Sequence, residues 1–460
     1  MERNNKKGLK IIIVGMGKVG QTLAEQLSEE AHDITVIDTT ASKVADITGR
    51  LDIMGVVGNG ASYSILNEAG IKETDLIIAV TGSDELNLLC CTMATAVGDI
   101  SAIARVRTPD YSNEIGYLQQ KLGLAMVINP ELEAAKEIAR ILYLPSALEV
   151  NTFANDHAEM IKIKIPAGNI LVGKDMIYLG KNIYSNVLVC AVERGGEVYI
   201  PTGGFTLEEG DVISFVASTR EIAKFFKAIE LKAHRVKDCV IVGGGKVAYY
   251  LAKQLFNMNI KVKVIESDHA RCEELSDLLP QAVIINGDGT DQDLLEEEGL
   301  RYAGSFIPLT GMDEENIMLT MYAKNVSSAK VVTKINRLNF KNVISGLDLG
   351  SIVYPRFITS EAIIAYVRAK SESMDRNIEN LYHMFDQRIE AIEFYISEDS
   401  DATNMPLMDL KLKDNLLISC INRNGKIIIP SGQDMLLKGD SVMVVTKHKG
   451  FSDIQDILVK

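Results

Sequence analysis

Residues 10–38 read KIIIVGMGKVGQTLAEQLSEEAHDITVID, and they carry the strongest indication of the fold. A short run of Ile and Val leads into a glycine-rich loop at 15–20, and a second apolar run ends at Asp38. Continuous apolar strands separated by helices are typical of a parallel sheet that is covered on both faces. We therefore predict a strand, an amphipathic helix over 18–29 and a second strand over 33–38.

The loop has the spacing Gly-x-Gly-x-x-Gly between a strand and a helix. The first glycine permits the tight turn, the second lets a pyrophosphate approach the backbone, and the third allows close helix–strand packing. Free N–H groups at the helix start then face the phosphates. Asp38 can accept both ribose hydroxyls and would repel a 2′-phosphate, which favours NAD over NADP. The predicted phosphate loop consists of Gly15, Met16, Gly17, Lys18, Val19 and Gly20.

The same loop occurs a second time, as VGGGKVA at 242–248. Gly15 and Gly243 are 228 residues apart, and so are Asp38 and Glu266. Outside the loops an offset of 229 relates GNGAS to GDGTD, TGSDELN to TGMDEEN, and GEVYIPTGG to GKIIIPSGQ. Two isolated motifs would not stay in register in this way. The sequence therefore indicates that a whole unit of about 229 residues has been duplicated.

The second loop departs from the first in two places. Ala248 stands where the third glycine is expected, and this small residue is an accepted variant. Glu266 keeps the negative charge but reaches further, so the second site differs in ligand or affinity, or is an empty copy of the fold. In both loops Lys is followed by Val, which excludes a P-loop ATPase because no hydroxyl is left for Mg²⁺. The second predicted loop consists of Gly243, Gly244, Gly245, Lys246 and Val247.

Other candidate ligand residues lie at the ends of later strands, where open α/β sheets bind ligands. The Thr-Gly pairs that end the fourth strands can place a backbone N–H near adenosine or phosphate. A cation ends each fifth strand and is a candidate phosphate clamp, or alternatively one half of a surface ion pair. These candidates are Thr81, Gly82 and Arg105 in the first copy and Thr310, Gly311 and Lys334 in the second.

Each copy divides into two parts by its pattern. Six apolar strands that alternate with helices predict a Rossmann-like parallel sheet, and the hairpin-like strands that follow predict a small α+β domain of mostly antiparallel strands. A helix over 219–230 is expected to end the first small domain. The four predicted domains are 8–130 and 236–357, which are Rossmann-like and nucleotide-binding, and 146–230 and 376–460, which are small.

Composition restricts the classes of function. The chain has 460 residues, a net charge of −14 and no cluster of Lys and Arg, so a nucleic-acid partner is not expected. No apolar stretch has the ~20 residues that a transmembrane helix requires. The six cysteines have no CxxC spacing and are interpreted as buried thiols in a reducing compartment. We therefore expect a cytoplasmic protein.

The sequence offers little chemistry for an enzyme. A hydride-transfer enzyme usually adds an acid or base such as His, Lys or Tyr to its cofactor site. The six histidines form no cluster, none recurs at the repeat offset, and HExxH and GxSxG are absent. No catalytic or metal-binding residue is therefore predicted. Two nucleotide sites without a recognisable catalytic group favour sensing over catalysis.

Residues 10–44, with GNGAS, AVTGSDELNLL and IARVRTPDY, resemble the regulatory proteins of Trk-type potassium-uptake systems. The resemblance covers essentially the whole chain and extends to the wider family of regulator-of-potassium-conductance (RCK/KTN) domains. It implies that the large domains bind NAD(H), and in some members ATP or ADP. It also implies a homo-oligomeric ring beneath a membrane potassium-transporting subunit, on the inner face of the membrane. The resemblance carries over to both loops, both acidic residues, both Thr-Gly pairs, Arg105 and, less directly, Lys334.

The resulting hypothesis is a nucleotide-binding regulatory subunit, not an enzyme, that gates potassium uptake. Single-unit relatives must dimerise to place two large domains together, and the tandem chain resembles that dimer made covalent. Two alternatives stay open. One is an NAD-dependent oxidoreductase with a duplicated cofactor domain. The other makes the small domains the receptor for a different small effector, such as a cyclic dinucleotide, with the large domains as a scaffold.

Overall fold

The computed structural model divides the chain into two compact units, which are described separately. Unit 1 comprises Met1–Ala134 and Tyr354–Val367, and unit 2 comprises Ala135–Val353 and Arg368–Lys460. The structure describes residues 8–30, 32–112, 114–144, 146–153, 157–184, 186–231, 236–336, 347–371, 378–385 and 388–459.

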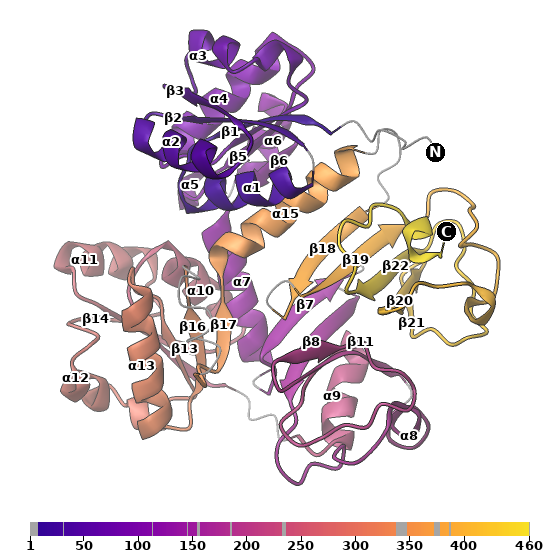
Figure 1. Ribbon diagram of the computed structural model, residues 1–460. Coiled ribbons are helices and arrows are strands. Elements are labelled where there is room, and N and C mark those ends of the chain that lie inside the picture. Colours follow the sequence, from indigo (N-terminus) through magenta and orange to yellow (C-terminus); the bar gives the residue numbers. More distant parts are fainter. Residues whose placement is uncertain are drawn as a thin grey trace. The chain divides into compact units, whose positions relative to one another are not determined.

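Unit 1 contains a six-stranded parallel sheet, the first parallel sheet, in the order β3-β2-β1-β4-β5-β6 (Figure 1). Its strands are β1 (Lys10–Val14), β2 (Asp33–Asp38), β3 (Met54–Val57), β4 (Leu76–Ala79), β5 (Ser101–Arg105) and β6 (Met126–Ile128). Its helices are α1 (Lys18–Glu29), α2 (Ala41–Arg50), α3 (Tyr63–Glu68), α4 (Asp84–Val97), α5 (Pro109–Ser112) and α6 (Ile115–Leu122). The central strands are buried on both faces, as their unbroken Ile and Val runs predict.

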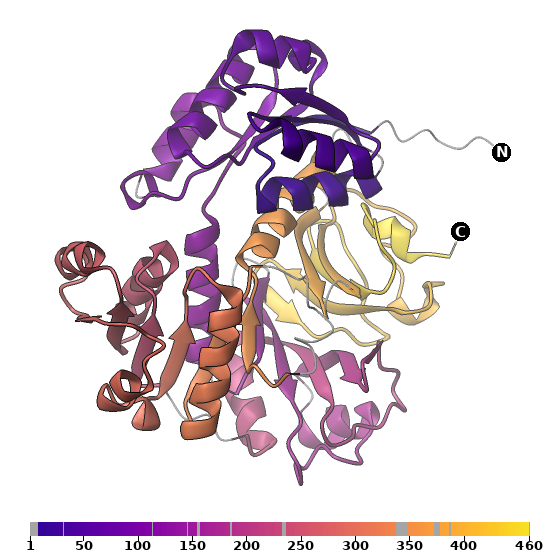
Figure 2. The same cartoon turned by 60° about the vertical axis from the view of Figure 1, so that its left-hand side comes forward.

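Unit 2 contains the second parallel sheet, in the equivalent order β14-β13-β12-β15-β16-β17. Its strands are β12 (Asp238–Val242), β13 (Lys261–Glu266), β14 (Val283–Asn286), β15 (Ser305–Pro308), β16 (Lys330–Lys334) and β17 (Ser351–Val353). Its helices are α10 (Lys246–Asn257), α11 (His269–Leu278), α12 (Gln292–Glu297) and α13 (Asp313–Val326), and α13 covers β15 and β16 (Figure 2). The chain passes between the units within α7 (Pro130–Tyr143), just before α15 (Pro355–Ser371), and again within α15.

Unit 2 also holds two five-stranded antiparallel sheets. The first, in the order β10-β9-β11-β8-β7, consists of β7 (Glu149–Phe153), β8 (Ala158–Lys164), β9 (Val187–Arg194), β10 (Glu197–Tyr199) and β11 (Val212–Ser218), with α8 (Met176–Tyr178) and α9 (Thr219–Ala228). The second, in the order β18-β19-β22-β20-β21, consists of β18 (Ile378–Met384), β19 (Ile389–Tyr395), β20 (Leu416–Arg423), β21 (Lys426–Ile428) and β22 (Ser441–Thr446).

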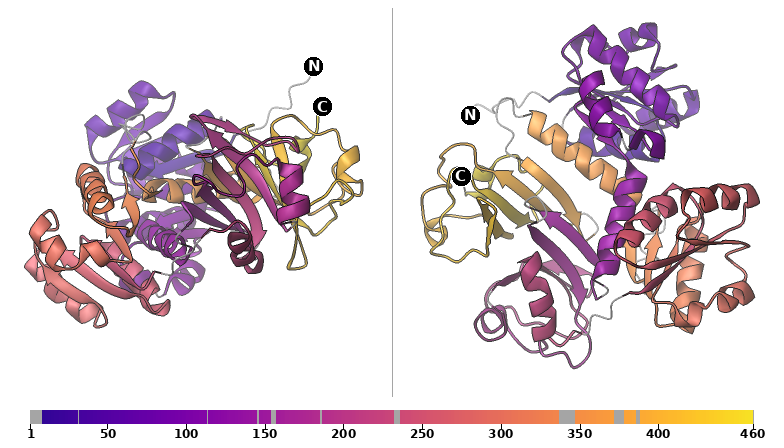
Figure 3. Two further views of the ribbon diagram at one scale, coloured as in Figure 1. Left: turned by 90° about the horizontal axis from the view of Figure 1, so that it is seen from below. Right: turned by 180° about the vertical axis from the view of Figure 1, so that it is seen from behind.

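The two antiparallel sheets pack against each other (Figure 3). One apolar cluster joins them, with Phe153 and Met160 from the first sheet and Phe385 and Met443 from the second. The other face of the first sheet packs on α9, where Phe225 lies against Phe215 with ring centroids 4.8 Å apart. Alternation of apolar residues along these strands therefore serves two cores, one on each face.

The structure confirms the predicted fold class, including α1 and β2 with the bounds expected from the sequence. Three features differ from the prediction. Strands β7 and β18 were not predicted, because Glu149–Phe153 and Ile378–Met384 mix apolar and polar residues and precede the clear hairpins. Helix α9 ends at Ala228, before the predicted end at 230. At the corresponding end of the second copy, the chain forms a 3₁₀ turn, Ile454–Ile457, where the repeat predicted a helix.

Two further sequence expectations can be compared with the described residues. All six cysteines are buried thiols, as interpreted from their spacing. Among the described residues, no helix combines the length and the apolar character needed to span a bilayer. Residues 376 and 460, which bound the second small domain predicted from the sequence, lie outside the described residues.

Candidate functional site

The first glycine loop lies at the carboxyl end of β1, between β2 and β4. The N–H of Gly15 donates to the carbonyl oxygen of Ile37 over 2.7 Å, which continues the ladder past the end of the strand. Gly15 has φ +100°, and a Cβ there would stand 2.9 Å from the backbone of Thr81. Glycine is therefore required here by both conformation and space.

The second and third glycines of this loop have opposite environments. Gly17 is the N-cap residue of α1, with an extended backbone, and a Cβ at this position would have no atom within 4 Å. A Cβ at Gly20 would stand 2.0 Å from the carbonyl oxygen of Gly15. Gly20 thus lets the helix close on the strand, whereas Gly17 leaves open space at the helix N-terminus. A phosphate fits such a space, because the first N–H groups of a helix have no partner within the helix.

The other predicted loop residues contribute mainly backbone. The side chains of Met16 and Val19 are buried in the domain, while Lys18 is exposed. In the second copy Val247 is buried and Lys246 is half-buried. Buried side chains cannot reach a ligand, so any contact from these valines or from Met16 would be made by the main chain.

Asp38, at the end of β2, is held by the loop itself. Its carboxylate accepts the N–H of Met16 over 2.7 Å and the N–H of Thr40 over 2.8 Å, and Lys43 lies 3.8 Å away. Burial would raise the pKa of this carboxyl, but the two backbone donors outweigh burial and lower it. Asp38 is therefore a fixed negative charge beside the glycine loop.

The loop after β4 is organised by Asn87, which is fully buried in α4. Its amide oxygen accepts the N–H of Thr81 over 2.8 Å and its amide nitrogen donates to the carbonyl oxygen of Arg105 over 2.8 Å. One side chain thereby fixes the ends of two neighbouring strands. Because the Thr81 N–H is already bonded, a ligand at this loop would meet the exposed Gly82 instead.

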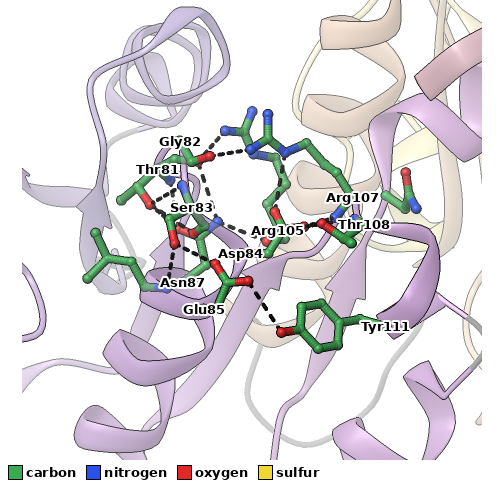
Figure 4. Close-up of polar contacts among 12 residues, drawn as sticks. Thr81, Gly82, Ser83, Asp84, Glu85, Asn87, Arg105, Arg107, Thr108 and Tyr111 are labelled. Atoms are coloured by element: carbon green, nitrogen blue, oxygen red, sulfur yellow. Dashed lines mark hydrogen bonds and ion pairs between the residues drawn. The ribbon is translucent and has the colours of Figure 1, made fainter. Parts of the chain in front are cut away.

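Two arginines and a buried carboxylate complete this edge of the sheet (Figure 4). Asp84 accepts the N–H of Arg107 over 2.8 Å and the hydroxyl of Thr108 over 2.7 Å. Arg107 also donates to the carbonyl oxygen of Gly82. Burial would raise the pKa of Asp84, and the donors around it lower that pKa instead. This network ties the fifth strand to the loop after the fourth.

Arg105 lies within the same edge, where its guanidinium donates to the carbonyl oxygen of Thr81. Burial and the neighbouring charge of Arg107 lower the pKa of Arg105. Its Nε is buried and has no acceptor among the described residues. Two adjacent guanidinium groups repel each other, so an anion between them and the loop would be stabilised.

The second copy reproduces this frame at the end of β12. Gly243 has φ +97° and its N–H donates to the carbonyl oxygen of Ile265 over 2.8 Å. Glu266 accepts the N–H of Gly244 over 2.6 Å, as Asp38 accepts that of Met16. Gly245 is the N-cap residue of α10 and again leaves open space at the helix N-terminus.

The loop after β15 is held by the same kinds of hydrogen bond as the loop after β4. Asn316 accepts the N–H of Thr310 over 2.9 Å and donates to the carbonyl oxygen of Lys334 over 3.1 Å. The ammonium of Lys334 donates to the carbonyl oxygen of Leu309 over 2.9 Å, close to where Arg105 acts in the first copy. Gly311 is exposed, as Gly82 is.

Sequence reasoning missed the residues that hold these loops in place. Asn87 and Asp84 lie in TGSDELN, and their counterparts Asn316 and Asp313 lie in TGMDEEN. The repetition of these two motifs was visible in the sequence, but Asn and Asp at the start of a helix look like ordinary helix caps. Arg107 was passed over in favour of Arg105, because the sequence does not show that the strand ends at Arg105 and that Arg107 reaches back to the loop after β4.

A Gly-rich loop at the carboxyl edge of a sheet with this strand order defines a Rossmann-type nucleotide-binding protein, here built twice in one chain. The TrkA-N domain matches residues 11–130 and 239–355, and the TrkA-C domain matches 160–230 and 391–459. The chain is 32% identical over 445 residues to the Trk system potassium uptake protein TrkA of Haemophilus influenzae, with 96% of both chains covered. It belongs to the family of Trk system potassium uptake proteins TrkA.

Further similarities agree with this assignment. The TrkA protein of Halomonas elongata is also 32% identical, again over 96% of each chain. The solved structure described as the GsuK channel bound to NAD has a TM-score of 0.63 at 17% identity, covering 97% of this chain and 78% of that one. The crystal structure of the GsuK RCK domain gives 0.62 at 18% identity, covering 96% and 93%. At these identities the GsuK structures show that the fold is shared.

Proposed function

We propose that this chain is the nucleotide-binding regulatory subunit of a Trk-type potassium uptake system. One observation carries the proposal: the open space at the N-terminus of α1 and of α10, beside a carboxylate fixed by the glycine loop, is built twice. The relatives are potassium uptake proteins, which supplies the process, and the protein of similar fold that binds NAD supplies a nucleotide class. The ligands proposed are NAD(H) and, as alternatives at the same loops, ATP or ADP.

The nucleotide's phosphates are proposed to bind at the N-termini of α1 and α10, with Asp38 and Glu266 accepting ribose hydroxyls. Each carboxylate accepts backbone N–H groups in the structure. Ribose hydroxyls of a ligand can take the place of these donors, so that the carboxylate stays charged and hydrogen-bonded. The remaining proposed contacts come from the loops after the fourth and fifth strands of each sheet. The full proposed set is Gly15, Met16, Gly17, Lys18, Val19, Gly20, Asp38, Thr81, Gly82, Arg105, Gly243, Gly244, Gly245, Lys246, Val247, Glu266, Thr310, Gly311 and Lys334.

Binding is proposed to regulate by shifting an equilibrium between two arrangements of the large domains. A ligand can do this only through different affinities for the two states, and coupling free energies are typically ~1–3 kcal/mol. The chain is proposed to act in the cytoplasm as part of a homo-oligomeric ring, on the inner face of the membrane through a potassium-transporting subunit. The four domains 8–130, 146–230, 236–357 and 376–460 are the proposed moving parts.

The main rival is an NAD-dependent oxidoreductase with a duplicated cofactor domain. It predicts consumption of bound NADH when a suitable metabolite is added, which the regulatory model does not. The rival in which the small domains bind the effector predicts that regulation survives when both glycine loops are blocked.

Counting nucleotide sites calorimetrically on the full chain tests the proposal. Gly17→Asp fills the open space at α1 with a carboxylate that also suits an N-cap, so it should remove one site without unfolding the domain. Gly245→Asp should remove the other site in the same way. Gly49→Asp, at an exposed glycine of α2 with open space around it, is the matched control. Saturable binding that neither loop variant alters would overturn the assignment of the site.

Potassium uptake with the membrane partner present provides the functional test. Asp38→Ala and Gly17→Asp should both abolish nucleotide control of uptake at the first site while the protein remains folded and associated. Uptake that still responds to nucleotide when both loops are demonstrably empty would contradict the regulatory proposal.

A further inference from the structure

The two sites share a backbone frame but differ in charge at three positions of the sheet edge. Asn59 of the first copy is replaced by Asp288, Leu86 by Glu315, and Arg107 by Asn336. Each replacement makes the second site more negative by one charge. By contrast, the exchanges of Asp38 for Glu266 and of Arg105 for Lys334 leave the charge unchanged.

Asp288 lies next to the second glycine loop. It follows β14, and the Cβ of the next residue, if Gly289 had one, would stand 2.2 Å from Cγ1 of Val242, the last residue of β12. The Oδ1 atom of Asp288 accepts the N–H and the hydroxyl of Thr290 over 2.9 and 2.8 Å. The carboxylate is therefore held just after the end of β14, in a turn that packs against the last residue of β12.

Glu315 lies in the first turn of α13, within range of the charge of Asp288. Its side chain is half-buried, burial raises the pKa of Glu315, and the charge of Asp288 raises it further. The corresponding Leu86 is instead partly buried and packs, as Ala61 and Ile65 do, against the apolar core around the first parallel sheet. A position that is apolar in one copy is thus half of a carboxylate pair in the other.

The third replacement removes a cation. Arg107 bonds to Asp84 and to the carbonyl oxygen of Gly82, so its charge lies at the loop where a ligand would bind. Asn336 makes the same kind of contact to Asp313, through its N–H over 2.9 Å and its amide nitrogen over 3.0 Å, but it brings no charge. Both residues help to hold the loop in place, but only Arg107 of the first copy adds a positive charge there.

We propose that Asp288, Glu315 and Asn336 make the second site select nucleotides with few phosphate charges, of the NAD(H) and AMP class, against free ATP and ADP. The first site, with Arg105 and Arg107, accepts the more highly charged nucleotides. The inference rests on the proposed nucleotide-binding function and adds the specificity of each site. One chain would then compare two ligands, with a dinucleotide at one loop and a polyphosphate at the other.

The test uses the full chain with one site blocked at a time. In Gly17→Asp protein only the second site is open, and in Gly245→Asp protein only the first. AMP, NADH, ADP and ATP are titrated calorimetrically with EDTA present, so that no divalent cation masks phosphate charge. At the second site we expect ATP to bind at least about ten-fold more weakly than AMP or NADH, and at the first site no such penalty.

Exchanging the charges then tests the cause. In the Gly17→Asp background, Asp288→Asn with Glu315→Leu and Asn336→Arg should strengthen ATP binding at least about ten-fold and change AMP and NADH binding less than about three-fold. Glu315→Gln alone should move the ATP-to-AMP ratio in the same direction by a smaller factor, and it provides the test if the triple variant fails to fold. Added salt should bring the affinities for ATP and AMP closer together in the Gly17→Asp protein, but not in the variant with exchanged charges.

The outcomes separate this inference from the proposed function. Preference for ATP at the second site, an unchanged ratio after the charge exchange, or no nucleotide at the second site while the first one binds would each overturn the inference alone. Failure of every nucleotide to bind at either site would overturn both.

Discussion

The two glycine-loop sites differ in the residues that face outward and agree in those that hold the loops. In each copy an Asn in the helix after the fourth strand bonds the loop N–H of a Thr and the carbonyl of a cation, through Asn87 in one and Asn316 in the other. The charges around these frames have diverged. The comparison teaches that buried polar groups constrain a duplicated domain more tightly than its ligand surface does, because an unpaired buried group is costly.

The small domains also share internal polar contacts and differ in other elements. Arg194 forms a two-point contact with buried Asp211, with N–O distances of 2.7 Å, and Arg423 does the same with Asp440 over 2.8 and 2.7 Å. The ends of the two copies, however, have different structures, with α9 in the first and a short 3₁₀ turn in the second. Internal ion pairs were kept while peripheral helices changed.

The largest expected difference between the copies concerns the third loop position. Gly20→Ala should destabilise the first domain by about 3 kcal/mol, because the new Cβ would meet the carbonyl oxygen of Gly15 at 2.0 Å. The reverse change, Ala248→Gly, should cost only about 1 kcal/mol of helix propensity. Denaturant unfolding of the full chain, with hydrogen exchange to assign each domain, checks both. Equal effects of the two changes would remove this distinction between the loops.

Substitution of the buried amide side chain in either copy should destabilise the two domains equally. Asn87→Leu and Asn316→Leu should each cost about 2 kcal/mol, since each leaves a loop N–H and a strand carbonyl without their partner. Asn67→Ala on the exposed face of α3 is the control and should lie within about 0.5 kcal/mol of the parent. Protection of the loop amides against hydrogen exchange provides the readout, and a loss confined to one copy would contradict the shared frame.

Acid should weaken the first domain through Asp84. The folded-state pKa of this carboxyl lies below its ordinary value, so its stabilisation is present at neutral pH and is lost as the pH falls through the folded-state pKa. We expect about 1 kcal/mol to disappear between about pH 5 and 3. Asp84→Asn should show a shallower decline over that range by hydrogen exchange of the strand β5 region. Parallel pH profiles for the two proteins would show that Asp84 does not contribute.

The smallest effect on stability should come from Glu315. Its dependence on pH should be opposite to that of Asp84. Its folded-state pKa is raised, so the ionised form destabilises the second domain above that pKa, and the penalty vanishes when acid protonates the group. Glu315→Leu should therefore stabilise the domain at pH 7 by a few tenths of a kcal/mol to about 1, and not at about pH 4. Thermal unfolding at the two pH values measures this, and a gain at pH 4 equal to that at pH 7 would exclude a charge effect.

Much of the fold was predictable from short words in the sequence. The apolar runs and the glycine loops predicted β1, and α1 and β2 with the bounds they have, because strand burial and the turn at Gly15 depend on local residues. Strands β7 and β18 were missed, since their partly polar sequences form strands only against a neighbouring sheet edge. The residues that hold the candidate site, Asn87 and Asp84, were missed for a related reason, because their bonds reach 18 to 24 residues along the chain.

The duplication, the two parallel sheets, the positions of both glycine loops and the acidic residue beside each could be read from the sequence. These depend on spacing and apolar periodicity, which a linear sequence carries directly. The folded structure was needed to show which charges meet at each sheet edge, that the N–H of Thr81 is already bonded, and that Gly17 faces open space where Gly20 faces a carbonyl. Such relations depend on distances between segments remote in the chain, and packing fixes those distances.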